Sequence, residues 1–183
     1  MSASNGMREY ITDAIVLGRQ PSGESDLLVD LFTKELGRVR VKVISGRKIL
    51  SKLSGNLNML NLVEARMVEK KSFTIADAIT KNTFSGLKKS QFLIGAALRG
   101  ARTIRELLPP GLPEPALWHE FVRMLRSSSV NTSTLLKIFG YGLEGAECAD
   151  CGRNKAAHFN LRDQVFLCAS CGVKSPENNL SLQ

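Results

Sequence analysis

One short stretch alternates strictly between cations and valines: Arg38-Val39-Arg40-Val41-Lys42-Val43. Successive side chains of a β-strand point to opposite faces, so this pattern predicts a half-buried strand. The valines would face a core. The three cations would form a row on the outer face, with about 6.8 Å between neighbours. This stretch therefore predicts a β structure with a positively charged outer surface.

Four other short apolar runs surround this stretch: Thr12 to Leu17, Asp26 to Thr33, Leu62 to Val68 and Thr74 to Ile79. Turn residues separate them, and a basic, turn-rich loop is expected from Ser45 to Gly55. Most of the intervals are too short for a crossover helix. Five short strands of this kind predict a small antiparallel barrel or sandwich.

The apolar period becomes helical from about Lys88 onward. The predicted inner face of a first helix consists of Leu93, Ala97, Ala101, Ile104 and Leu108, and that of a second consists of Leu117, Phe121, Met124 and Leu125. Pro109 ends the first helix, Pro115 suits the start of the second, and the Ser127–Ser129 triplet ends it. A short third helix, capped by Thr132, would carry Leu135, Leu136, Ile138 and Phe139. We interpret these aliphatic faces as core.

All four cysteines lie near the end of the chain, in two C-x2-C pairs: Cys148 with Cys151, and Cys168 with Cys171. Two such pairs, sixteen residues apart, predict a four-cysteine zinc site. Four thiolates complete a tetrahedral shell and leave no position for water or substrate, so the single zinc ion would be structural. The alternatives are free or disulfide-bonded thiols, a redox pair, or a site that uses His158 as a ligand.

The residues around the cysteines fit a zinc ribbon. Phe159 to Leu161 and Gln164 to Leu167 resemble the two strands of its hairpin. Gly152 and Gly172 each follow the second cysteine of a pair, where we expect positive φ as the chain turns back under the metal.

The chain has 25 Lys and Arg against 17 Asp and Glu, a net charge of +8, which zinc bound to four thiolates would change to +6. Seven cations lie in one segment that holds a single acid, Glu35: Lys34, Arg38, Arg40, Lys42, Arg47, Lys48 and Lys52. This segment predicts a surface for a phosphodiester backbone, with a solvated barrel face as the alternative. The first 80 residues hold only three aromatics, Tyr10, Phe32 and Phe73, so phosphate contacts should outweigh base stacking.

Several classes of protein are disfavoured by the sequence. No apolar run approaches a membrane span and no signal peptide is evident, so we expect a cytoplasmic protein. The chain has two histidines and lacks a glycine-rich phosphate loop. It also lacks a carboxylate pair beside a nucleophile at a recognisable spacing. We therefore assign no catalytic residues and expect no enzymatic activity.

Longer stretches of the chain resemble a known family. Ala14–Arg19, Gly23–Val29 and Leu31–Val39 are similar to the N-terminal signature of RecO, the bacterial recombination mediator family, and Phe139–Tyr141 resembles the family's entry to its zinc segment. The resemblance implies an α+β fold with an N-terminal five-stranded OB-fold barrel, then a small helical domain and a four-cysteine zinc ribbon. The corresponding domains would span residues 8–82, 83–147 and 148–172, with a short tail to 183.

The resemblance also implies a function. Family members bind single- and double-stranded DNA, anneal complementary strands, and act with RecR and single-stranded-DNA-binding protein to load a recombinase. They are cytoplasmic and associate with the nucleoid. The four cysteines match the family's metal ligands, and Arg38, Arg40, Lys42 and Arg47 fall in its basic strand and loop. The chain is shorter than is usual for the family, so we assign no residues to partner surfaces.

Two other functions remain open from the residues alone. The same barrel and ribbon would suit an RNA-binding protein, or a protein-interaction adaptor whose basic face engages acidic tails.

Overall fold

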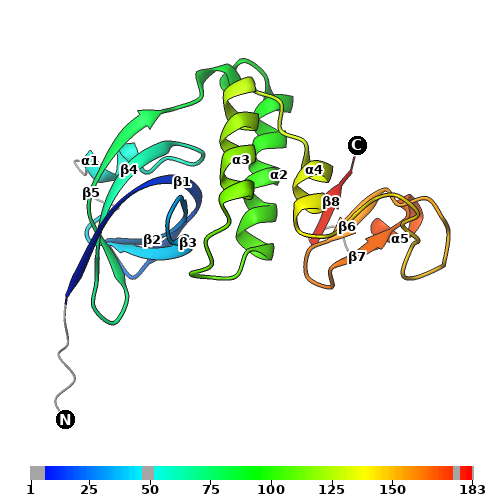
Figure 1. Ribbon diagram of the computed structural model, residues 1–183, viewed down its shortest axis with the longest axis horizontal. Helices are drawn as coiled ribbons and strands as arrows, with labels where there is room; N and C mark the ends of the chain where they lie inside the picture. Colours follow the sequence, from blue (N-terminus) through cyan, green and yellow to red (C-terminus); the bar gives the residue numbers. More distant parts are fainter. Residues whose placement is uncertain (1–6, 47–51, 175–177, 183) are drawn as a thin grey trace, which may run out of the picture.

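Five strands form a closed barrel in the computed structural model, which describes residues 7–46, 52–174 and 178–182 (Figure 1). The strands are β1 (Arg8–Ser22), β2 (Asp26–Thr33), β3 (Gly37–Val43), β4 (Leu62–Glu69) and β5 (Phe73–Asn82). Their order around the barrel is β1-β2-β3-β5-β4, and β3 and β5 form the only parallel pair among these strands. The predicted α+β fold with an OB-fold barrel is confirmed.

The alternation of β3 has the predicted orientation. Val39, Val41 and Val43 are buried in the barrel, and Arg40 and Lys42 are exposed on its outer face. β1 is longer than the predicted run because it closes the barrel: its first half pairs with β4 and its second half with β2. A β-bulge between Val16 and Gly18 lets one strand serve both neighbours.

A short helix, α1 (Lys52–Asn56), lies between β3 and β4, where the sequence predicted only a loop up to Gly55. Asn56 stabilises its position: the side-chain amide donates to the carbonyl oxygen of Ala78, and the side-chain oxygen accepts from the Thr80 hydroxyl. Leu57, directly after the helix, is fully buried in the barrel core. The loop prediction therefore missed a turn of helix that presents Leu57 to the barrel interior.

Three α-helices follow a 3₁₀ turn at Ser85–Lys89: α2 (Gln91–Leu107), α3 (Pro115–Ser127) and α4 (Thr132–Ile138). The predicted inner faces of α2 and α3 are buried, apart from the partly buried Leu93. Ser128 ends α3 in a left-handed conformation with φ 54°. The predicted cap of α4 is wrong by one residue, because Asn131 accepts a hydrogen bond from the backbone N–H of Thr134.

The helices share a core with the barrel. Ile15, Leu17 and Phe32 of the barrel pack in one cluster with residues of α2 and α3. The rings of Phe32 and Trp118 meet edge to face, with centroids 5.3 Å apart. The helical layer therefore covers the outer side of β1 and β2, at the end of the barrel nearer the ribbon (Figure 1).

A small three-stranded sheet ends the chain, in the order β7-β6-β8. The predicted hairpin is present as β6 (His158–Asn160) and β7 (Val165–Leu167). The sequence did not predict α5 (Ala169–Gly172) or β8 (Asn179–Ser181). Phe159 lies between the rings of Tyr141 and Phe166, with centroids 4.8 and 5.1 Å away, and shares a cluster with Leu136 of α4. α2, α3 and α4 therefore lie between the barrel and this sheet (Figure 1).

None of the helices in the described part of the chain is long and apolar enough to cross a membrane.

Candidate metal centre and nucleic-acid interface

The four cysteine sulfur atoms meet at one point. Cys148, Cys151, Cys168 and Cys171 place their Sγ atoms within 4.8 Å of one another, and the Sγ atoms of Cys151 and Cys168 are 3.7 Å apart. Zinc–sulfur bonds of about 2.3 Å in a tetrahedron require sulfur–sulfur distances of about 3.8 Å. The cluster therefore has the dimensions of a tetrahedral thiolate site and could hold a metal ion.

Two similar turns present these sulfurs. The backbone N–H of Gly152 donates to the carbonyl oxygen of Cys148, and that of Gly172 donates in the same way to Cys168. A backbone hydrogen bond from Ala149 to Phe166 joins the first turn to β7. Three of the cysteines are buried and Cys151 is exposed. The backbone therefore organises both pairs around a single point.

The two glycines have different roles. Gly152 has φ 69°, as the sequence predicted. Gly172 is part of α5 and has no positive φ, so the prediction for it is wrong. A Cβ at Gly172 would lie 2.3 Å from Cδ2 of His158, so glycine is required there by close packing. His158 thus supports the second turn and does not belong to the sulfur cluster.

The thiols are electrostatically coupled. The Ser170 hydroxyl, 3.2 Å from the Cys168 sulfur, and backbone hydrogen bonding lower the pKa of Cys168 to about 6. The hydrogen bond with Cys168 and burial raise the pKa of Cys171 to about 12. Four sulfurs this close ionise together only when a cation offsets their mutual repulsion. The donor set, all soft sulfur in a compact tetrahedral arrangement, fits zinc.

The predicted basic residues fall partly on one face. Arg38, Arg40 and Lys42 lie along the outer side of β3, and the exposed Lys34 lies in the β2–β3 turn. Arg47 and Lys48 are outside the described residues, as is the side chain of Lys52. The structure thus brings together the β3 cations, hereafter the β3 row (Arg38, Arg40 and Lys42).

Each cation of the β3 row has a protein partner. Arg40 pairs with Asp30, directly opposite on β2, at 2.8 Å and 3.2 Å. The ammonium of Lys42 is 2.9 Å from Asp26. Arg38 donates from Nε to the carbonyl oxygen of Leu108, at the end of α2. The positive charge of the row is therefore reduced by two carboxylates of β2 that lie outside the segment from Lys34 to Lys52.

These pairs affect ionisation. Hydrogen bonds from Lys42 and from the backbone N–H of Ser45 lower the pKa of Asp26. Hydrogen bonding to Asp30 raises the pKa of Arg40. Both groups therefore stay ionised at neutral pH, and the row has a fixed pattern of charge.

The barrel aromatics do not form a stacking platform on β3. Phe32 is buried against Trp118. Tyr10 and Phe73 contact each other with ring centroids 5.8 Å apart, and the Tyr10 hydroxyl donates to Glu69. Phe32 is a core residue, as expected.

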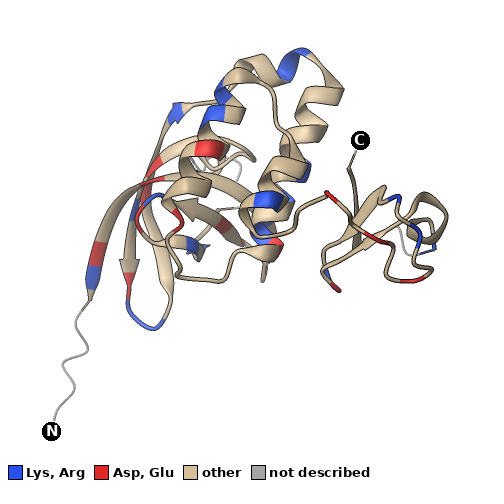
Figure 2. Ribbon diagram, turned by 45° about the vertical axis from the view of Figure 1, so that its right-hand side comes forward, with Lys and Arg blue, Asp and Glu red and all other residues tan. Residues whose placement is uncertain are grey.

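Cations outside the predicted segment add to the charged surface. Lys and Arg residues occur on the barrel, the helices and the ribbon (Figure 2). Arg102 and Arg105 of α2 line a common cavity with Arg162 of the β6–β7 turn. Sequence reasoning missed this set because its members are separated by up to sixty residues, and only the packing of the ribbon near α2 brings them together.

Comparisons with known proteins find similar sequences. The family profile described as "Recombination protein O N terminal" matches residues 7–84, which span the barrel. The chain is 28% identical over 177 residues to a protein of Dehalococcoides mccartyi named "DNA repair protein RecO", covering 89% of this chain and 70% of that protein.

Two further relatives with the same name have similar sequence identity and coverage. A Geobacter metallireducens protein is 27% identical, with coverage of 91% of this chain and 74% of the relative. A Myxococcus xanthus protein is 27% identical, with coverage of 94% and 76%. Each of these relatives matches most of the length of this chain, and residues 7–84 are similar to the N-terminal part of the RecO family.

Proposed function

We propose that this protein acts in DNA repair as a non-enzymatic mediator. It binds single- and double-stranded DNA through the phosphodiester backbone, promotes annealing of complementary strands and assists loading of a recombinase. Its similarity to proteins named "DNA repair protein RecO" and the outward β3 row support this proposal. The observation that carries the DNA-binding part is the row itself, three cations on one strand face beside the helical layer.

The ion pairs of the row are compatible with phosphate binding. A guanidinium has five N–H donors, and Asp30 engages two of those on Arg40, so three remain for a phosphate. The Arg40 side chain is 51% exposed, whereas that of Asp30 is 7% exposed. Asp30 thus holds the guanidinium in place from below, which reduces the entropy lost when a phosphate binds from solvent.

Annealing follows from the same chemistry. Two strands repel each other until their phosphate charge is neutralised, and a cationic surface does this by displacing counterions without reading bases. The absence of an exposed aromatic on β3 fits a surface that holds any sequence. Binding should therefore weaken steeply with salt.

The cysteine cluster would hold one zinc ion with a structural role. Bound zinc would neutralise part of the thiolate charge and fix both turns, because a small sheet with few buried side chains needs such a crosslink. The three segments 8–82, 83–147 and 148–172 would act as barrel, helical and zinc units. We propose no catalytic role for any residue.

The partners implied by the family are RecR and single-stranded-DNA-binding protein. Co-purification of this chain with each of them, in the presence and absence of DNA, tests this part. Failure to associate with either would remove the partners from the proposal and leave DNA binding to be judged separately.

Annealing tests the central activity. Fluorescently labelled complementary strands are mixed with increasing protein, with and without single-stranded-DNA-binding protein, and duplex formation is followed. We expect acceleration that disappears at high salt. A strong preference for structured RNA would favour an RNA-binding protein. Absence of DNA binding at low salt with retained affinity for an acidic peptide would favour an adaptor.

A further inference from the structure

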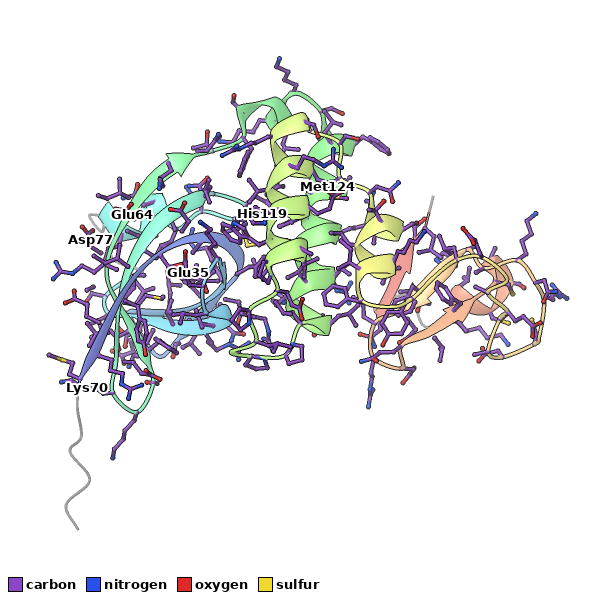
Figure 3. All side chains as sticks on the ribbon, in the orientation of Figure 1. Glu35, Glu64, Lys70, Asp77, His119 and Met124 are labelled. Carbon is purple, nitrogen blue, oxygen red and sulfur yellow. The ribbon has the colours of Figure 1, made fainter. Side chains whose placement is uncertain are left out.

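An open pocket lies at the end of the barrel where β1 begins and the β4–β5 hairpin turns. Its volume is about 510 Å³, in the range of sites for small ligands. Figure 3 shows Lys70 at this end of the barrel, beside the start of β1. We call this the hairpin pocket, and none of its lining residues that the structure describes is acidic: Met7, Ile44, Val68, Lys70, Lys71, Ser72 and Thr74.

Two side chains of the pocket are apolar and exposed. Met7 and Ile44 are each 64% exposed. They are far apart in the sequence, and closure of the barrel brings them to one hollow. A single exposed apolar residue is ordinary on a protein surface, whereas two that line one pocket form an apolar binding surface.

A turn at the end of β3 fixes the outward position of Ile44. The preceding residue, Val43, is buried in the barrel core. The following residue, Ser45, has φ 54°, and its backbone N–H donates to Asp26 at 2.8 Å. Ile44 is thus held outside the barrel by its two neighbours, and it continues the outward alternation of the β3 row.

The pocket is continuous with the β3 row. Outward side chains two residues apart on a strand are separated by about 6.8 Å, so Ile44 comes next after Lys42. Thr74 of β5 pairs with Lys42 on one side and with Val68 of β4 on the other. One outer surface therefore leads from the β3 row into the hairpin pocket, and a nucleic-acid strand held by the row reaches the pocket next.

The basic side of the pocket is the β4–β5 turn. Lys70 and Lys71 are both exposed, and neither forms an ion pair within the described part of the chain. Glu69, the acid just before this turn, accepts a hydrogen bond from the Tyr10 hydroxyl. Two uncompensated ammonium groups beside an apolar hollow favour a ligand that combines an apolar face with negative charge.

A nucleotide of single-stranded DNA has both properties, in the face of its base and in its phosphate. Neighbouring bases cover these faces in a duplex, so only a single strand presents a base face to Met7 and Ile44. Apolar side chains contact the face of a base without reading its edge, so any base fits.

We infer that the hairpin pocket binds an unstacked base of the single strand that occupies the β3 row, with Lys70 and Lys71 on the adjacent phosphates. This inference rests on the proposed DNA binding and deepens it. It gives the protein a means to distinguish single-stranded from double-stranded DNA at a surface that otherwise contacts only the backbone.

Two variants separate the apolar and the basic contributions. The apolar variant is M7Q/I44T, and the lysine variant is K70Q/K71Q. All four residues are exposed, so the core is left intact, and equal melting temperatures check this. The matched controls replace exposed residues outside the pocket: I11T/I79T on the barrel, and K88Q/K89Q in the 3₁₀ turn before α2.

The two variants should differ in salt dependence. M7Q/I44T loses apolar contact but no charge, so it should bind a single strand about tenfold more weakly at an unchanged salt slope. Its affinity for duplex DNA should equal that of wild type. K70Q/K71Q should have a salt slope lower by about 1.4 with a single strand, at about 0.7 for each lost phosphate contact. Both controls should match wild type.

An abasic strand tests the base contact directly. A strand of equal length built from abasic sugars keeps every phosphate and lacks the bases. Wild-type protein should bind it about tenfold more weakly than the normal strand, because the pocket is left without an apolar partner. M7Q/I44T should bind the two strands alike.

The outcomes separate this inference from the proposed function. If M7Q/I44T keeps both the wild-type affinity and the wild-type preference for bases, while R40Q/K42Q loses salt slope, the pocket inference is wrong and the proposed function stands. If M7Q/I44T instead loses binding of a labelled peptide that alternates Glu and Leu, with DNA binding unchanged, the pocket docks a protein and the inference is wrong. If wild-type protein binds no single strand at low salt, the proposed function is wrong and the inference falls with it.

Discussion

Arg40 on β3 and Asp30 on β2 face each other across the barrel surface and form a two-point ion pair, at 2.8 and 3.2 Å. The carboxylate is buried and the guanidinium is half exposed. This pair connects the core side of the barrel to its proposed DNA surface. A mutation at Asp30 should therefore affect stability and binding in opposite directions.

Replacing Asp30 by Asn should strengthen DNA binding and lower stability. The change removes a negative charge beneath the β3 row but keeps a side-chain oxygen that can accept a hydrogen bond from Arg40 and hold its guanidinium in place. It weakens the pair by about 1 kcal/mol, a small value because Arg40 is half exposed. Fluorescence anisotropy and denaturant unfolding measure the two effects. Asp77→Asn is the matched control, because Asp77 is an exposed residue of β5, away from the helices (Figure 3). Equal binding by both variants would contradict the prediction.

Lowering the pH should reduce the free energy of unfolding, in part because Asp26 becomes protonated. Its pKa in the folded state is lowered from an ordinary value of 3.8 by Lys42 and by the N–H of Ser45. The stabilisation is therefore complete above that value and is lost as the pH falls through the lower folded-state pKa. Asp26→Asn should flatten the pH dependence of the unfolding free energy below about pH 4. An unchanged acid slope in this variant would show that Asp26 does not contribute.

A methyl group at Gly172 should disrupt the ribbon. The added carbon would lie 2.3 Å from the His158 ring, and we expect a loss of about 1 to 3 kcal/mol together with weaker zinc binding. Gly152→Ala is the control: that site has φ 69° but open space, so about 1 kcal/mol of backbone strain is expected.

A second substitution identifies the cause. In the double variant G172A/H158A the ring is absent, and most of the stability and zinc affinity should return. Failure of the double variant to recover either property would exclude the packing explanation. Zinc titration and thermal melting are the readouts.

Removing zinc should unfold the C-terminal sheet and leave the remainder folded. Cys148, Cys168, Cys171 and Leu167 form one small cluster, which is distinct from the clusters of the barrel and the helices. Treatment with a strong chelator should release one zinc ion per chain, and amide signals from β6 to β8 should disappear from NMR spectra. Retention of those signals without metal would show that zinc is dispensable for the fold.

The barrel and helices should unfold together. Trp118 of α3 meets Phe32 of β2 in their shared cluster, so Trp118→Ala should cost about 3 to 5 kcal/mol and destabilise both parts. In the wild-type protein, we expect far-UV circular dichroism and the fluorescence of Trp118, the one tryptophan of the chain, to show the same single unfolding transition. Two separate transitions would mean that the barrel and helices fold independently.

The sequence predicted the strands well where alternation or length was distinctive. β2 matches its predicted bounds, and the inner faces of α2 and α3 are as expected. The extension of β1 depends on a bulge and two partners, which local pattern does not reveal. β8 follows no clear alternation, and it is a strand because it pairs with β6.

For similar reasons, the sequence predicted the cysteine cluster but not the ion pairs of the β3 row. Cysteine spacing is local, and the four cysteines do converge. Counting charges along the chain missed Asp26 and Asp30, because strand pairing places them beside the cations of β3. The cavity lined by Arg102, Arg105 and Arg162 could not be predicted for the same reason, because these residues meet only in the folded protein. His158 packs against Gly172, and the spacing of the cysteines in the sequence does not reveal this contact.

The salt dependence of single-strand binding by R40Q/K42Q tests the central claim most directly. Arg66→Gln is the control, since Arg66 is 57% exposed and paired with Glu9 on another face of the barrel. We predict that R40Q/K42Q binds every sequence more weakly, with a salt slope lower by about 1.4, while R66Q matches wild type. Identical slopes for wild type, R40Q/K42Q and R66Q would contradict the assignment of DNA binding to the β3 row.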